Sequence, residues 1–200
     1  MHSYAVTKLI TNSIFCLLIL SILVESVAAQ QDCVMLQDGI NMETKMYIRE
    51  VAPSLLFNHT PPEVKNDLLT DNLMECQAQV IKKEDKVYLH LNLHVHSKLA
   101  PSIYGGIPQG NLLKVTLING REVDLKCYAG SNGVLMDDQS GYIYPLGFTL
   151  EKSTQRTLQK KAIDKIGIQW TTGYEEYVIY EVDFFMNQLG CLNQTTQKLN

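Results

Sequence analysis

Hydrophobic and polar residues alternate along much of the chain, and this pattern predicts a protein built mainly from β-strands. It is clearest in residues 86–97, where apolar side chains from Val87 to Val95 alternate with tyrosine, histidine and asparagine. A period of two places successive side chains on opposite faces of a strand. We therefore expect one face of this strand to lie in the core and the other at the surface.

Two hairpins are expected around this pattern. Residues 74–80 alternate in the same way, and the polar turn Lys83–Lys86 joins them to the strand described above. Apolar alternation on both sides of Asn119–Arg121 predicts a second hairpin with a three-residue loop. That loop places Val115 opposite Leu125 and keeps the apolar side chains on one face.

Further elements are expected toward the carboxyl end of the chain. Strands are predicted at residues 141–150, 166–170 and 176–180, and short helices at 151–161 and 182–189, the second ending at Gly190. The expected fold class is mainly β. It is a sandwich or half-open barrel of antiparallel hairpins with two short helices.

The first twenty-nine residues have the pattern of a secretory signal peptide. Lys8 precedes the apolar run Ile14–Val24, and Val27-Ala28-Ala29 is a small-residue cleavage sequence. The apolar run is too short for a transmembrane helix. We therefore expect cleavage before Gln30 and an exported protein, located in the periplasm or outside the cell.

Composition limits the domain organisation and the partners. The remaining 171 residues are enough for a hydrophobic core, so we expect one β-rich domain over residues 30–192 and a flexible tail over 193–200. The net charge is −4, and no basic stretch is suited to neutralising phosphates of nucleic acid. No later segment has the apolar length of a membrane span. Nucleic acid is therefore not an expected partner, and no transmembrane span is expected after cleavage.

Cysteine positions agree with export. Cys16 lies in the leader, and an even set follows it, which consists of Cys33, Cys76, Cys127 and Cys191. Two disulfides are the usual outcome in an oxidising compartment, and four cysteines allow three pairings. Cys76 and Cys127 fall on apolar strand faces, whereas Cys33 and Cys191 lie at the two ends of the domain. We expect Cys76–Cys127 in the core and Cys33–Cys191 between the ends.

Histidines on the polar face of residues 86–97 are candidate metal ligands. His94 and His96 are two positions apart, about 6.6 Å along a strand. A two-residue turn between the first pair of strands would place Glu75 opposite His94. Two histidines and a carboxylate suit zinc. A solvent-facing strand also needs polar residues, so a metal-binding protein or metalloenzyme is the alternative interpretation. No catalytic residue is predicted, and G-x-S-x-G is absent from the sequence.

Tyrosines offer a second kind of site. They are Tyr88, Tyr128, Tyr142, Tyr144, Tyr174, Tyr177 and Tyr180. Aromatic side chains on a sheet can stack against a glycan or a partner protein, although tyrosines in strands also pack half-buried. The sequence therefore favours a binding or envelope-structural role, with an envelope protein or a glycan as partner and an unknown ligand.

The second half of the chain resembles a known group of proteins. The matching segments are residues 112–125, Gly141-Tyr142, residues 148–150, residues 163–168, Thr172-Gly173-Tyr174 and residues 184–192. On these motifs the region from about residue 110 to residue 192 resembles uncharacterised small exported proteins of Bacteroidetes-type bacteria. The resemblance implies a location in the bacterial envelope or outside the cell, and it implies no activity.

Overall fold

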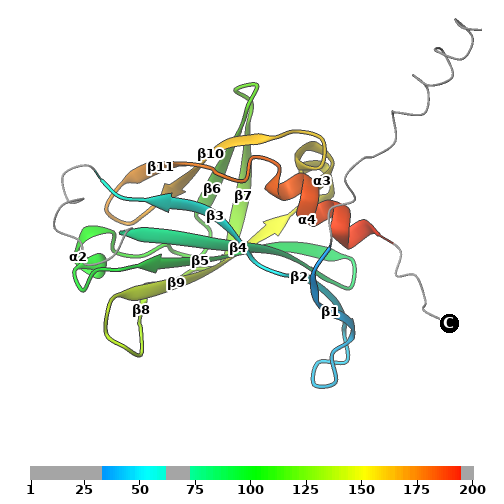
Figure 1. The fold of residues 1–200 in the computed structure, drawn as a ribbon, viewed down its shortest axis with the longest axis horizontal. Helices are drawn as coiled ribbons and strands as arrows, with labels where there is room; N and C mark the ends of the chain where they lie inside the picture. Colours follow the sequence, from blue (N-terminus) through cyan, green and yellow to red (C-terminus); the bar gives the residue numbers. More distant parts are fainter. Residues whose placement is uncertain (1–32, 62–72, 195–200) are drawn as a thin grey trace, which may run out of the picture. The chain divides into compact units, whose positions relative to one another are not determined.

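In the computed structural model, residues 33–61 and 73–194 are described, and within these ranges eleven strands belong to one antiparallel sheet (Figure 1). The strands are β1 (Met35–Ile40), β2 (Tyr47–Val51), β3 (Ser54–His59), β4 (Met74–Lys83), β5 (Lys86–Val95), β6 (Leu112–Leu117), β7 (Glu122–Ala129), β8 (Val134–Leu135), β9 (Tyr142–Leu150), β10 (Ile163–Gln169) and β11 (Tyr174–Val178). The helices are α2 (Ala100–Ile103), α3 (Lys152–Leu158) and α4 (Phe184–Asn193). The leader at residues 1–29 lies outside the described residues, as does the predicted tail beyond Gln194.

The strand order is β1-β2-β4-β5-β9-β7-β6-β10-β11, with β3 beside β4 and β8 beside β9. Two strands share one edge of β4, because β3 pairs with residues 74–78 and β2 with residues 81–83 (Figure 1). The N–H of Tyr180, just after β11, donates to the carbonyl of Leu56 in β3 at 3.1 Å. The sheet therefore approaches closure without completing a barrel, in agreement with the predicted fold class.

The core lies on the sheet face that the alternation predicted. On β5 the apolar side chains from Val87 to Val95 are buried, and the polar side chains between them are partly exposed. Trp170 and Tyr177 are also buried, and the indole N–H donates to the Tyr177 hydroxyl at 3.0 Å. That hydroxyl donates to the carboxylate of Glu175 at 2.6 Å. Tyr177 and the equally buried Tyr144 therefore belong to the core and not to a surface platform.

The β6–β7 hairpin has a three-residue loop, but its predicted register is wrong. Val115 pairs with Val123 and not with Leu125, because the loop is residues 118–120. The N–H of Gly120 donates to the carbonyl of Leu117 at 2.8 Å, and Gly120 has a φ of 79°. Glycine takes this conformation without a steric penalty. The loop therefore ends at Gly120, and the paired strand resumes at Arg121. The two registers differ by two residues, and both place the same side chains in the core.

Helix α4 continues past the predicted end at Gly190. Its last turn buries Leu189, Cys191 and Leu192, and the helix packs against β4, β2 and α3. Glycine inside a helix costs only about 1 kcal/mol, so this packing outweighs the local preference for ending there. Within residues 33–61 and 73–194, no helix has the length and apolar character needed to cross a membrane.

Candidate functional site

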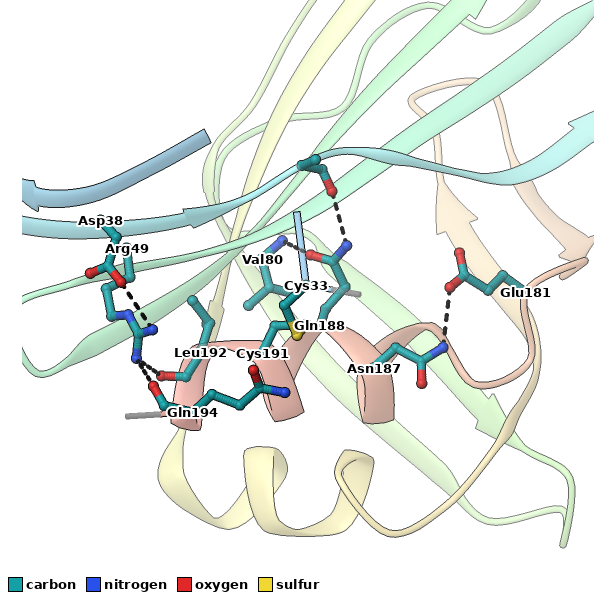
Figure 2. Close-up of a disulfide and its surroundings, with 11 residues drawn as sticks. Cys33, Asp38, Arg49, Val80, Glu181, Asn187, Gln188, Cys191, Leu192 and Gln194 are labelled. Atoms are coloured by element: carbon teal, nitrogen blue, oxygen red, sulfur yellow. Dashed lines mark hydrogen bonds and ion pairs between the residues drawn. A yellow bond between two sulfur atoms is a disulfide. The ribbon is translucent and has the colours of Figure 1, made fainter. Parts of the chain in front are cut away.

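A disulfide joins the two ends of the described domain. Cys33, just before β1, bonds to Cys191 in the last turn of α4, with their Cα atoms 5.5 Å apart (Figure 2). This pairing confirms the prediction for Cys33 and Cys191. It ties the first strand to the last helix across a separation of 158 residues.

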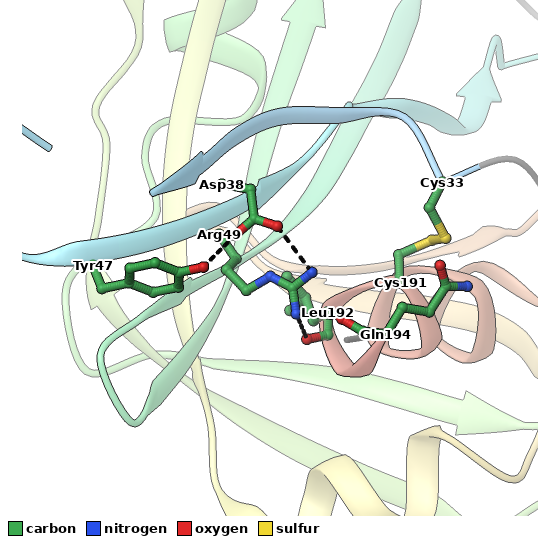
Figure 3. A network of polar contacts seen from close by, with 7 residues as sticks. All are labelled: Cys33, Asp38, Tyr47, Arg49, Cys191, Leu192 and Gln194. Atoms are coloured by element: carbon green, nitrogen blue, oxygen red, sulfur yellow. Dashed lines mark hydrogen bonds and ion pairs between the residues drawn. A yellow bond between two sulfur atoms is a disulfide. The ribbon is translucent and has the colours of Figure 1, made fainter. Parts of the chain in front are cut away.

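Arg49 of β2 provides a second connection to α4. Its Nη1 donates to the carbonyls of Leu192 and Gln194, at 2.5 and 2.9 Å, and its Nη2 lies 3.2 Å from a carboxylate oxygen of Asp38 (Figure 3). A cation at the carboxyl end of a helix is stabilised by the unpaired carbonyls there. The guanidinium of Arg49 therefore bonds to backbone carbonyls and to a carboxylate of the same chain. We assign these contacts a structural role.

The predicted disulfide between Cys76 and Cys127 is wrong, because both are free, buried thiols. Cys76 is on β4 and Cys127 on β7, with β5 and β9 between them. Three strand spacings amount to about 14 Å along the sheet, whereas bonded cysteines have Cα atoms within about 7 Å. Burial raises the pKa of both thiols, so neither has the thiolate character of a reactive cysteine.

The candidate metal ligands are brought together only in part. Glu75 lies directly opposite His94, as the two-residue turn predicted, whereas His96 follows the end of β5. Among the described residues, no group of three or more His, Cys, Asp or Glu side chains is placed to hold a metal ion. Burial lowers the pKa of His94, the charge of His96 lowers it further, and Glu75 raises it. These three residues therefore do not form the predicted zinc site.

A different group gathers on the outward face of β5, β9 and β7. We call Tyr88, His90 and Tyr128 the outer-face cluster. His90 pairs across the sheet with Gly147, and the ring of Tyr128 lies over that glycine. A Cβ atom at Gly147 would be 2.6 Å from Cζ of Tyr128, so the ring needs a glycine beneath it. The Tyr128 hydroxyl and Nε2 of His90 are 2.6 Å apart.

Neighbouring side chains complete this surface. The rings of Tyr88 and Tyr128 meet edge to face, with centroids 5.0 Å apart and planes at 62°. Lys83 Nζ lies 6.0 Å from the centroid of the Tyr88 ring. Opposite His90 on β4, Gln79 donates to the carboxylate of Glu50 at 3.0 Å. A row of aromatic and polar groups therefore runs across neighbouring strands, from β2 to β7.

The electrostatics of the outer-face cluster favour uncharged rings. Burial lowers the pKa of His90, and the charge of Lys83 lowers it further. Burial also raises the pKa of Tyr128. Near neutral pH the imidazole is therefore uncharged, and the Tyr128 hydroxyl and Nε2 of His90 share a hydrogen bond whose donor is set by the imidazole tautomer. The cluster therefore presents two tyrosine rings and an uncharged imidazole on one face of the sheet.

Sequence reasoning identified the members of this cluster but not their association. Tyr88 and His90 follow from the alternation in β5, and Tyr128 was one of seven candidate tyrosines. Their proximity depends on β9 lying between β5 and β7, with a glycine at the crossing point. Tyr174 lies elsewhere, on β11, where its ring covers Gly167 in the same way. Gly147 was the sequence feature that could have indicated this contact, because a glycine inside a strand often marks a place where another group approaches the backbone closely.

Comparisons of this chain with protein-family models, with curated proteins and with solved structures find no match.

Proposed function

We propose that the protein is an exported binding domain and that its outer-face cluster binds a saccharide of an envelope or extracellular glycan. The leader-like first twenty-nine residues and the Cys33–Cys191 disulfide support export, because disulfides form in oxidising compartments. The β-rich, disulfide-joined scaffold holds the binding face on rigid strands.

One observation carries the proposal. The ring of Tyr128 is held over Gly147, and its hydroxyl is fixed by the 2.6 Å contact with His90. The side chain is nevertheless only partly buried. An aromatic ring that is already fixed loses little conformational freedom when a ligand stacks on it. The cluster is therefore a preorganised platform, in contrast to a mobile surface tyrosine.

The groups around the platform match the chemistry of a sugar. One face of a pyranose ring is rich in C–H groups and suits an aromatic surface, while its hydroxyls need hydrogen-bond donors and acceptors. The imidazole of His90 and the amide groups of the partly exposed Gln79 and Asn92 offer hydrogen-bonding groups on the same face. His90 and Tyr128 are uncharged near neutral pH, so we expect a neutral saccharide.

The test uses protein purified from an exporting host. Affinity electrophoresis against a panel of soluble neutral polysaccharides identifies a ligand, and titration calorimetry measures its Kd. Tyr128→Ala is expected to raise Kd by about tenfold or more, because one stacked ring contributes on the order of 1.5 kcal/mol. Tyr128→Phe keeps the ring and should cause a smaller loss.

Tyr174→Ala is the matched control, because it removes a tyrosine that also covers a glycine but whose hydroxyl donates to Glu176. It is expected to leave Kd unchanged. Equal losses in Tyr128→Ala and Tyr174→Ala would show that covering the glycine is a structural role. Failure of every polysaccharide to bind would also contradict the proposal. Circular dichroism confirms that each variant is folded.

A further inference from the structure

Positive charge is concentrated at the turn between β4 and β5 and around α3. Residues 82–86 and 151–161 contain seven basic and three acidic side chains, although the whole chain has a net charge of −4. The basic residues are Lys82, Lys83, Lys86, Lys152, Arg156, Lys160 and Lys161. These two segments are distant in sequence, and the fold brings them to one place.

A cavity of about 330 Å³ lies where the two segments meet. Lys82 of β4 lines it together with Lys152 and Arg156 of α3, and Asp85 is its acidic residue. Three basic side chains against one carboxylate leave an excess of positive charge. A second cavity, of about 590 Å³, shares Asp85 and Lys152 and adds Lys86 and Glu151, so the excess of positive charge belongs to the first cavity. We call the first cavity the basic groove.

None of the cations of the basic groove forms an ion pair with another described residue. The ion pairs formed by the described residues are Arg49–Asp38, Lys114–Glu122 and Lys165–Glu176, and none of them involves a groove residue. The groove also has an apolar floor, because the buried residues Val87, Leu189 and Leu192 line it. Like charges that converge on a concave apolar surface repel one another, and an anion between them removes that repulsion.

We propose that the basic groove binds a phosphate group, carried by a small soluble ligand or by a lipid headgroup. An arginine fork and lysine ammonium groups are the side chains best suited to the oxygens of a phosphate. Gln155 provides a further polar lining, and its side chain is held in place by donating to the carbonyl of Leu150 at 2.7 Å. The proposal is independent of saccharide binding, because the groove contains no residue of the outer-face cluster.

Pyrophosphate is the soluble probe, measured by titration calorimetry on protein purified from an exporting host. The double variant Lys152→Gln/Arg156→Gln is expected to raise Kd by about tenfold or more, since each charge-assisted hydrogen bond is worth about 1.5–3 kcal/mol. The control Lys98→Gln/Arg121→Gln removes the same two charge types from exposed positions elsewhere. It should change Kd by less than about twofold, because distant exposed charges are screened by salt.

Vesicles separate the two sources of phosphate. Co-sedimentation with phosphatidylcholine vesicles that contain phosphatidic acid, but not with pure phosphatidylcholine, would identify a lipid headgroup. Binding of pyrophosphate without binding of vesicles would identify a soluble ligand. The proposal fails if neither probe binds, or if the control variant loses as much affinity as the groove variant. Tyr128→Ala should bind pyrophosphate with the Kd of the parent protein. Failure of the phosphate proposal can therefore be distinguished from failure of the saccharide proposal.

Discussion

Oε1 of Gln188 accepts a hydrogen bond from the backbone N–H of Val80 at 3.0 Å, in the middle of the β4 edge (Figure 2). On this edge the pairing with β3 ends at Ala78 and the pairing with β2 begins at Ile81. Nε2 of the same side chain donates to the carbonyl of Ala52, between β2 and β3, at 3.0 Å. One buried amide from α4 therefore supplies the hydrogen bonds that the interrupted sheet lacks.

Replacing Gln188 with leucine is expected to destabilise the protein by about 2–4 kcal/mol. The substitution leaves two backbone groups without partners, and each buried unsatisfied group costs about 1–3 kcal/mol. Urea unfolding followed by circular dichroism measures the change. Gln159→Leu, at a partly exposed position after α3, is the control and should stay within about 0.5 kcal/mol. A loss in Gln188→Leu no larger than in this control would contradict the role given to the amide.

Loss of the Cys33–Cys191 disulfide is expected to lower the unfolding free energy by about 4–5 kcal/mol. The bond closes nearly the whole domain into one loop, and the loop-entropy model gives the greatest stabilisation for long loops. A thermal scan with and without reductant, on the parent protein and on Cys33→Ala/Cys191→Ala, measures this effect.

The free thiols provide the control for the disulfide. Reductant should lower the Tm of the parent and of Cys76→Ala/Cys127→Ala by similar amounts, and should not change the Tm of Cys33→Ala/Cys191→Ala. Peptide mapping should recover Cys33 linked to Cys191. A peptide that links Cys76 to Cys127 would show that the pairing described here is incorrect.

Gly147→Ala is expected to displace the ring of Tyr128 and to destabilise the protein by about 1–3 kcal/mol. The new methyl group would lie 2.6 Å from Cζ of Tyr128, which is overpacking at a buried position. Gly39→Ala is a matched exchange in β1, where an added Cβ meets nothing within 4 Å. It should not destabilise the protein comparably. Chemical denaturation compares the two, and equal effects would contradict the contact between Tyr128 and Gly147.

Stability is expected to decrease as the pH falls below about 6.5. The pKa of His90 is lowered in the folded state by burial and by Lys83, whereas histidines of the unfolded chain titrate near 6.5. The unfolded chain therefore takes up protons that the folded protein does not bind. The stabilisation is fully present above about pH 6.5 and is lost as the pH falls toward the folded-state pKa. The pKa of His94 is shifted in the same direction.

Urea unfolding at about pH 7.5 and about pH 5.5 measures this dependence. Depressed carboxyl groups such as Glu176 titrate below this interval and contribute little within it. His90→Gln should reduce the difference between the two pH values, whereas Asn92→Gln on the same strand face should not. A pH dependence that His90→Gln leaves unchanged would show that His90 is not a source of the effect.

The buried and exposed faces of β5, and its register with β4, followed from the sequence. The period of two in residues 86–95 set the buried and exposed faces of β5, and the polar turn at Glu84-Asp85 set its alignment with β4. Both are local, because they depend on the alternation along one chain segment and on the number of residues in one turn. The positions of Cys33 and Cys191 at the two ends of the domain led to the correct pairing, whereas the strand faces of Cys76 and Cys127 led to a wrong one.

Other features required the three-dimensional arrangement. β1, β2 and β3 carry no comparable alternation, and neither these strands nor α2 were predicted. Their residues gain structure from neighbours that are distant in sequence, as with β2 and β3 on the edge of β4. The same holds for α4, in which burial of Cys191 and Leu192 outweighs the local tendency to end at Gly190.

The sequence by itself determined the buried and exposed faces of β5 and that the protein is mainly β, and it led to the expectation that Cys33 pairs with Cys191. Only the tertiary structure decided that β9 separates β5 from β7, which brings Tyr128 to His90 and keeps Cys76 apart from Cys127. It also decided that α3 lies beside the β4–β5 turn, where the basic groove forms. The physical reason is that alternation reports the geometry of one strand, whereas the choice of neighbouring strands depends on contacts summed over the whole fold.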